Sequence, residues 1–216
     1  ILYARLATRA PKAVSWALVR DAPHAVVRER ETMAQQDQVK RSHGFLRLVL
    51  MVVVVLACVW GLRTFVIAPY EIPSGSMETT IMTGDRIFSE KITYYTRDIQ
   101  AGDIVTFDDP INPGRTLIKR VIATGGQTVD LRDGVVYVDD VPLAESYTHG
   151  LPSYPLSVTA VDVSFPYTVP QGDVWVMGDN RTNSADSRSF GAVPVANVTG
   201  KACAIYWPLN RIGGLS

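Results

Sequence analysis

An uninterrupted apolar run divides this chain of 216 residues. Residues 48–62 read LVLMVVVVLACVWGL without a charged side chain, and apolar residues continue on both sides beyond Arg47 and Arg63. A helix needs about 20 mainly apolar residues to cross a bilayer, and flanking arginines can reach the interface along their aliphatic stems. We therefore predict a transmembrane helix over 45–67. A buried core helix and a cleaved targeting segment are the alternatives.

The basic residues around this run are distributed unevenly. Three basic residues lie before the uncharged run, namely Lys40, Arg41 and Arg47, whereas Arg63 is the only basic residue directly after it. Positive charge is retained on the cytoplasmic side of a membrane. The pattern therefore predicts a single-pass protein of the cell membrane, with its N-terminus in the cytoplasm and residues 68–216 outside it.

The beginning of the chain differs in composition from the rest. Residues 1–32 are rich in alanine, arginine and valine and show no clean amphipathic run, while Met33 opens a short polar and basic lead into the apolar segment. Such a segment buries too little apolar surface to fold by itself. We expect residues 1–44 to be disordered and cytoplasmic, and translation to begin at Met33, so that residues 1–32 are not part of the native protein.

Downstream of Pro69 the pattern changes to short apolar or alternating runs separated by turn residues, which is typical of β-strands. These runs are 85–95, 102–107, 116–124, 134–140, 163–169, 173–178 and 201–207. Asp133-Gly134, between the segments QTVDLR and VVYVD, predicts a two-residue hairpin. We expect a mainly β fold: one N-terminal transmembrane helix, then residues 68–216 as an antiparallel coiled sheet or barrel-like domain, with a less regular insert around 144–164.

Composition argues against several function classes. Lysine plus arginine and aspartate plus glutamate both total 21, so the formal net charge is zero and no overall attraction to nucleic acid is expected. The metal-binding patterns CxxC and HExxH are absent. We therefore expect no nucleic-acid partner, no metal and no cofactor.

Two serines, Ser74 and Ser76, lie in the small-residue stretch PSGSM soon after the apolar run. The stretch can be read as a flexible join or as the site of a nucleophile. A serine hydroxyl needs a neighbouring base, usually a histidine. His24 and His43 precede the apolar run, which leaves His149 as the only histidine on the same side of a membrane. A histidine-based triad is therefore poorly supported.

A lysine can replace histidine when burial disfavours its charged form. Lys119 lies in the β-rich run TLIKRVI, where alternation places it on one face with Leu117 and Val121. That face is apolar, as a lysine base requires. The alternative is an ordinary charged residue that protects a strand edge from aggregation.

Four segments in order, PSGSM, GDIVTF, LIKRVI and GDNRTNSADSR, resemble the conserved boxes of bacterial type I signal peptidases. The resemblance covers roughly residues 45–210. It implies a membrane-bound serine endopeptidase, with Ser76 as nucleophile and Lys119 as general base, that removes N-terminal signal peptides from exported preproteins after an Ala-x-Ala-like site. Expected partners are these signal peptides, the lipid bilayer and the secretion machinery.

The same resemblance implies further roles. Ser74 would contribute to the oxyanion hole, Ser184 would hydrogen-bond the Lys119 amine, and Asp186 with Arg188 would form a structural ion pair. Small apolar substrate pockets would be lined by Ile72, Met77, Ile81, Leu117 and Ile118. The signal peptide would bind extended, as an added strand. The chain departs from the family pattern after Met77, where a proline is missing, and at Thr182, where an aspartate is common.

Two other functions compete with this interpretation. A Ser/Lys self-cleaving repressor would share the dyad and the β character, but it would need a DNA-binding helical domain in place of the apolar run. A membrane-tethered β-domain that binds an envelope partner without catalysis would use PSGSM only as a linker.

Overall fold

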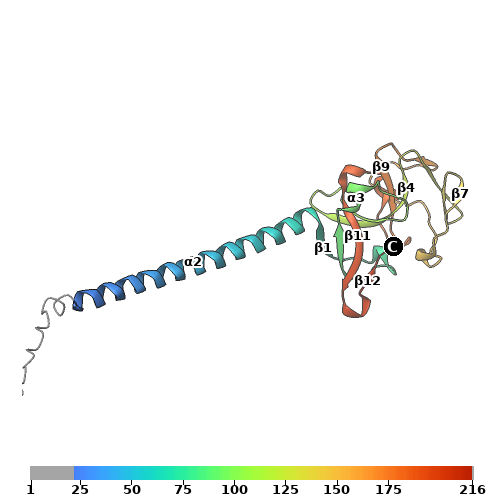
Figure 1. Cartoon of the computed structure of the whole chain (residues 1–216). Coiled ribbons are helices and arrows are strands. Elements are labelled where there is room, and N and C mark those ends of the chain that lie inside the picture. Colours follow the sequence, from blue (N-terminus) through green and yellow to red (C-terminus); the bar gives the residue numbers. More distant parts are fainter. Residues whose placement is uncertain (1–21, 216) are drawn as a thin grey trace, which may run out of the picture. The chain divides into compact units, whose positions relative to one another are not determined.

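The computed structural model describes residues 22–215. Its first element is α2 (Ala22–Phe65), drawn from blue to cyan in Figure 1. Within this helix the segment Gly44–Arg63 has a mean hydropathy of 2.6 and is long and apolar enough to cross a membrane. None of that segment is buried against the described part of the chain. A helix that is apolar all round and unburied suits a lipid environment.

The predicted disorder of residues 1–44 is wrong for residues 22–44, which are helical. Pro23 lies in the first turn, where its missing N–H is not needed, and the following residues are largely good helix formers that extend the apolar helix cooperatively. The helix also ends at Phe65 rather than at 67, because Ile67 already pairs with Glu90 in the first strand pair. Residues 1–21 lie outside the described residues, and a start at Met33 stays a prediction.

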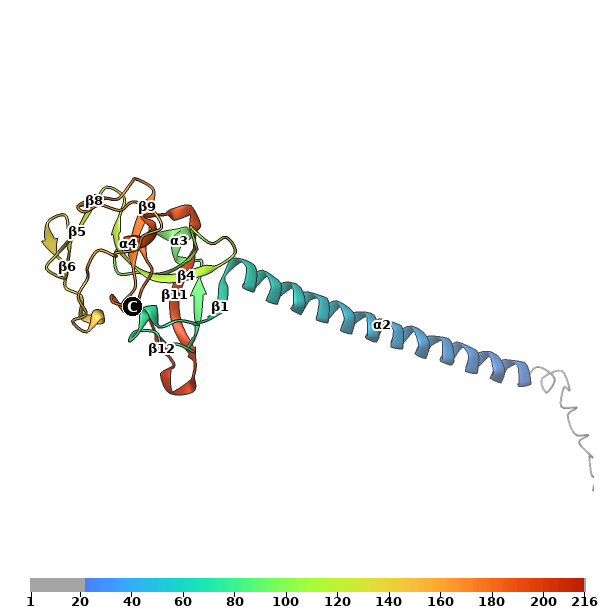
Figure 2. The ribbon, with the colours of Figure 1, turned by 180° about the vertical axis from the view of Figure 1, so that it is seen from behind.

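The rest of the chain is built from short strands, drawn from two sides in Figures 1 and 2. The strands are β1 (Ile67–Glu71), β2 (Arg86–Glu90), β3 (Ile104–Asp108), β4 (Thr116–Thr124), β5 (Thr128–Arg132), β6 (Val135–Val138), β7 (Val141–Pro142), β8 (Tyr167–Thr168), β9 (Asp173–Met177), β10 (Val193–Pro194), β11 (Val198–Trp207) and β12 (Gly213–Gly214). The short helical turns are η1 (Gly75–Met77), α3 (Thr93–Thr96), η2 (Ser146–Thr148), α4 (Ser187–Phe190), η3 (Val195–Asn197) and η4 (Leu209–Arg211).

These strands form two antiparallel sheets. The larger, 8-stranded sheet has the order β1-β2-β11-β3-β4-β9-β10, with β12 paired to β11. The smaller, 4-stranded sheet has the order β7-β6-β5-β8, and Figure 2 shows β5, β6 and β8 grouped beyond β9. The large sheet is curled, with shifts of register along β11 and between β4 and β9. The predicted fold class, a mainly β antiparallel coiled sheet after an N-terminal apolar helix, is confirmed.

Local signals account for much of this arrangement. The predicted hairpin joins β5 to β6 through Asp133 and Gly134, which have φ of 51° and 84°. Two consecutive residues with positive φ form the turn whose twist matches a two-residue hairpin. Between β7 and β8 the chain from 143 to 166 contains only one short turn of helix, in keeping with the insert expected around 144–164.

The core lies on both faces of the curled sheet. One cluster contains Ile72, Met77, Ile81, Ile87, Ile104, Ala202 and Ile205; a second contains Ile99, Val105, Phe107, Val121, Val174, Val176, Phe190 and Val193. Strand β4 contributes to both faces, since Leu117 packs against the second cluster and Ile118 against the first. A side chain from the middle of β4 is therefore surrounded by apolar packing.

Candidate active site

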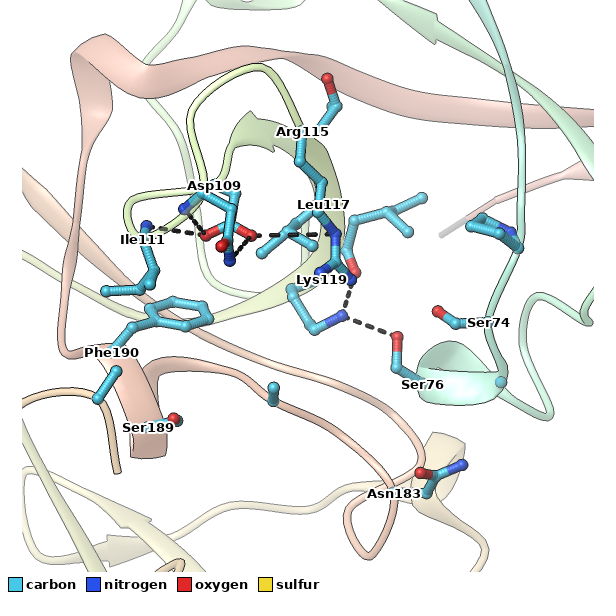
Figure 3. A pocket seen from close by; sticks show the side chains of 17 residues that line it. Ser74, Ser76, Asp109, Ile111, Arg115, Leu117, Lys119, Asn183, Ser189 and Phe190 are labelled. Atoms are coloured by element: carbon cyan, nitrogen blue, oxygen red, sulfur yellow. Dashed lines mark hydrogen bonds and ion pairs between the residues drawn. The ribbon is translucent and has the colours of Figure 1, made fainter. Parts of the chain in front are cut away.

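Lys119 and Ser76 are in direct contact, although they are 43 positions apart in the chain. The Lys119 Nζ donates a hydrogen bond to the Ser76 Oγ at 2.7 Å and another to the Ile118 carbonyl oxygen at 2.9 Å (Figure 3). Only 3% of Lys119 and 8% of Ser76 are exposed. The pair is therefore shielded from water except through the cavity into which it opens.

Burial changes the chemistry of the Lys119 amine. Removal from water penalises the ammonium form and lowers the pKa of Lys119 to about 8. The negative charges of Asp186, Asp179 and Asp109 raise the pKa, and the positive charge of Arg115 lowers it, but desolvation is the largest cause. A substantial fraction of this lysine is therefore neutral in mildly alkaline solution and can accept a proton.

Ser76 lies in η1, and the loop after β9 holds that turn. The Asn180 N–H donates to the Ser76 carbonyl oxygen at 3.1 Å, and its Nδ2 donates to the Gly75 carbonyl oxygen at 3.0 Å. The Met77 side chain is fully buried beside them. The hydroxyl of Ser76 therefore projects from a backbone that is fixed on both sides.

Gly178, at the end of β9, is needed for this close approach. A Cβ at this position would lie 2.5 Å from the Ser76 carbonyl oxygen and would also overlap the Ser184 Oγ. Such a distance is too short for any side chain to be accommodated without movement of η1. The absence of a side chain at Gly178 thus sets the position of the Ser76 turn.

We therefore expect Gly178→Ala to lower the kcat/KM of a reaction at Ser76 by about 100-fold, because a shift of about 1 Å in a reacting group has an effect of this size. An activity assay with the purified full chain measures it. Gly214→Ala is the matched control, since its Cβ would approach no atom closer than 3.9 Å. Full activity of the Gly178→Ala variant would show that η1 can move to accommodate the added Cβ without displacing the Ser76 hydroxyl from its working position.

Three further polar residues of the predicted site, Ser184, Asp186 and Arg188, lie between β9 and β10. Asp186 and Arg188 form an ion pair, with Arg188 Nε 2.9 Å from Asp186 Oδ1, and both side chains are almost fully buried. The Ser184 Oγ is also buried but has no hydrogen-bond partner among the described residues. The expected hydrogen bond from Ser184 to Lys119 is therefore not formed in this structure, since the amine donates to Ser76 and Ile118 instead.

Sequence reasoning overlooked a set of buried ionic contacts behind the dyad. Arg120 binds both carboxylate oxygens of Asp179 at 2.9 Å, and the Thr80 hydroxyl donates to the same carboxylate at 2.5 Å. Arg181 is paired with Glu145 of the insert. A charged residue next to Lys119 in an apolar strand was the available signal, because a buried guanidinium requires a partner.

Ser76 and Lys119 open into a cavity of about 360 Å³. Ser74, which is exposed, lies at the Ser76 end, and Leu117, Ile118, Ile111 and Phe190 supply apolar wall (Figure 3). Among the described residues, no group of three or more His, Cys, Asp or Glu side chains is arranged to hold a metal ion.

The five predicted pocket residues do not share one location. Leu117 and Ile118 line the cavity. Ile72, Met77 and Ile81 are at most 3% exposed and belong to a core cluster behind it. The prediction thus differs from the structure for these three residues, because apolar identity gives burial without saying whether a side chain faces a cavity or the core.

Comparison with known proteins shows the family of the chain. The family profile described as "Signal peptidase, peptidase S26" matches residues 45–207. The chain belongs to this family. A protein of Synechocystis sp. named "Probable signal peptidase I-1" is 43% identical over 173 residues, which cover 77% of this chain and 83% of that protein.

Two further relatives carry the same description. The "Signal peptidase I" of Leptolyngbya laminosa is 39% identical over 162 residues, covering 72% of this chain and 76% of its own length. A crystal structure of a signal peptidase I from Enterococcus faecalis V583 is 35% identical, covers 49% of this chain and 97% of its own, and gives a TM-score of 0.41.

The chain is thus a serine peptidase that removes signal peptides from preproteins. Signal peptidase I proteins are membrane-associated, and the apolar segment Gly44–Arg63 fits that property. The predicted family and activity are confirmed. The self-cleaving repressor and the non-catalytic tethered domain are no longer needed to explain the sequence.

Proposed function

We propose that Ser76 and Lys119 are the catalytic dyad that cleaves signal peptides after an Ala-x-Ala-like site. The observation that carries the proposal is the 2.7 Å contact between Lys119 Nζ and Ser76 Oγ in a nearly water-free position. A serine becomes a nucleophile when a neighbouring base can take its proton, and the lowered pKa of Lys119 makes its amine such a base.

The reaction proceeds by acyl transfer. Neutral Lys119 accepts the Ser76 hydroxyl proton while the oxygen attacks the scissile carbonyl carbon, and the protonated amine then gives that proton to the leaving amino group of the mature protein. The signal peptide remains attached as an ester of Ser76. Lys119 next removes a proton from water, whose oxygen attacks the ester carbon. The bond to Ser76 Oγ then breaks, and the protonated amine returns the proton to that oxygen, which releases the signal peptide and restores the Ser76 hydroxyl and the neutral lysine.

Ser74 and the turn η1 provide the expected oxyanion site. The Ser74 hydroxyl lies beside Ser76 at the cavity (Figure 3), and the Ser76 N–H lies in the first turn of a helix, where N–H groups have no partner within the helix. Donors preorganised in this way act on the charge of the tetrahedral intermediate, and each can be worth about 3 kcal/mol.

The loop after β9 has a positioning role in this proposal. The Asp186–Arg188 pair fixes the loop that presents Asn180 to the Ser76 turn. The buried Oγ of Ser184 is unpartnered among residues 22–215 and lies next to Gly178. In this proposal it orients the amine when Lys119 rotates during turnover. Neither role requires contact with the substrate.

Substrate selection follows from the cavity wall. An extended peptide beside β4 would present small residues one and three positions before the cut to the wall formed by Leu117 and Ile118. Ile72, Met77 and Ile81 support that wall from the core. Larger side chains would overlap these tightly packed residues, which accounts for an alanine preference.

The pH dependence of kcat/KM tests the proposed dyad. Because Lys119 must be neutral to act, activity should fall as the pH drops through about 8, by about tenfold per unit well below that value. The measurement uses the full chain in detergent, with its thermal unfolding checked at each pH. A profile that stays flat across this range would exclude Lys119 as the base.

For the membrane arrangement we propose that the apolar part of α2 crosses the cell membrane once, with residues 68–216 outside the cytoplasm. Support comes from Lys40, Arg41 and Arg47 on the N-terminal flank of the apolar segment. Protease added to sealed spheroplasts should digest the β-rich domain and leave a protected N-terminal fragment. Protection of the domain until the membrane is opened would reverse the orientation.

A further inference from the structure

The wall of the active-site cavity carries a positive charge beyond its apolar part. Arg115 directly precedes β4 and, with Leu117 and Lys119, lines the cavity. Because side chains alternate along an extended chain, these three residues share one face. They form a row in which the Lys119 amine is followed by the apolar Leu117 side chain and then by the Arg115 guanidinium. Figure 3 shows all three at the cavity.

The turn before β4 fixes the position of Arg115. The Asp109 N–H donates to the Arg115 carbonyl oxygen at 2.8 Å, and the Arg115 N–H donates to the Asn112 carbonyl oxygen at 3.3 Å. The Asp109 carboxylate in turn accepts hydrogen bonds from Ile111 and Asn112 at 2.8 to 3.1 Å. The backbone that carries Arg115 is therefore tied at both ends of the turn.

The hydrogen-bond donors of the Arg115 guanidinium are not used within the described chain. It is 62% exposed, and its Nε lies 3.9 Å from Asp109 Oδ2, which is too long for a hydrogen bond. Within residues 22–215 its guanidinium makes no other hydrogen bond or ion pair that the structure defines. A guanidinium offers five donors in a fork that matches a carboxylate. Arg115 can therefore receive an acidic side chain from a ligand in the cavity.

The spacing of the row indicates which substrate residue reaches Arg115. Two extended chains side by side advance by nearly the same distance per residue, about 3.3 Å. In the other direction along β4, Val121 is fully buried and does not line the cavity, so the peptide must run parallel to β4. With the residue before the cut beside Lys119, the third residue before the cut then meets Leu117 and the fifth meets Arg115. We propose that Arg115 is a specificity-determining residue that binds an acidic side chain five residues before the cleaved bond. This inference rests on the proposed dyad and on the extended binding of the signal peptide.

A charge-swap experiment tests the inference. Three preproteins carry Glu, Gln or Lys five residues before the cut, and kcat/KM is measured with the full chain in neutral detergent. The wild type should prefer Glu to Gln by about threefold to fivefold and Gln to Lys by a similar factor, as for a solvent-accessible ion pair. Arg115→Gln should cleave all three equally, and Arg115→Glu should prefer Lys. The preferences should shrink at an ionic strength of about 1 M, where the Debye length is about 3 Å.

Two variants serve as controls. Arg115→Lys keeps the charge and should keep the order of preference, and Arg132→Glu changes the net charge of the protein at a position on β5 that does not line the cavity. Equal cleavage of the three preproteins by the wild type would overturn the role of Arg115 while leaving the dyad intact. No cleavage of any preprotein would overturn the proposed dyad and this inference together.

Discussion

Replacing Lys119 by arginine is expected to abolish preprotein cleavage although the positive charge is kept. Arginine stays protonated at all accessible pH values, so it cannot take the Ser76 hydroxyl proton. Loss of one member of a catalytic unit lowers kcat by about four to six orders of magnitude. The assay measures kcat/KM for cleavage of a preprotein by the purified full chain.

Lys119→Met and Ser76→Ala should be as inactive as the arginine variant, and the double variant should be no worse than either, because the two residues act as one unit. Lys119→Met should fold, since replacing a buried cation by an apolar side chain of similar length is often neutral or stabilising. Lys201→Met is the matched control: Lys201 pairs with Asp103 and its side chain is 25% exposed. If Lys119→Met were about as active as the control, the assignment of Lys119 as the general base would be wrong.

Most of the fold could be predicted because its signals are local. The apolar run, the alternating strands and the Asp133-Gly134 turn depend on residues that are neighbours in the chain. The two-residue strands β10 and β12 could not be predicted, since their pairing depends on where β9 and β11 happen to lie. The helical conformation of residues 22–44 was missed because those residues lack an amphipathic pattern, although their helix propensity is high.

The candidate site, like the fold, could be predicted only where the signal is local in the sequence. Alternation along β4 placed Lys119 on the correct face, with Leu117 and Val121, but it could not supply the partner of the amine. That partner came only from the resemblance of PSGSM and LIKRVI to a family. The position of Arg120 in an apolar strand indicated that it needs a partner, but it could not identify Asp179, because a pair separated by 59 positions leaves no pattern in one sequence.

The buried charges of the site share one structural purpose. Asp179 binds both Arg120, next to Lys119, and Thr80, downstream of Ser76, so one carboxylate links β4 to the segment that carries Ser76. The Gly178 N–H donates a hydrogen bond to the Asp186 carboxylate at 3.0 Å, and the Ser76 turn approaches Gly178 closely. Ionic contacts at these positions fix the relative placement of these segments together with the apolar cluster that Met77, Ile81 and Ile118 share. Their loss should therefore affect folding before chemistry.

Asp186→Asn is expected to destabilise the protein by about 3 to 5 kcal/mol, because it leaves the Arg188 guanidinium buried without its countercharge. Asp186 accepts four hydrogen bonds, from the Gly178 N–H and from the backbone, Nε and Nη2 of Arg188, and its side chain is 0% exposed. For a chain of this size such a loss lowers Tm by roughly 10 °C. Thermal unfolding of the β-rich domain in detergent, followed by circular dichroism, measures it.

Asp140→Asn provides the matched comparison. Asp140 lies 2.5 Å from Arg132 Nη2, a shorter contact than the one between Asp186 and Arg188, but its side chain is 82% exposed. Water already solvates both charges there, so the substitution should cost less than about 1 kcal/mol. Burial, rather than distance, is what gives the inner pair its larger effect. Equal shifts of Tm in the two variants would mean that the Asp186–Arg188 pair is not the structural element that holds the loop beside Ser76.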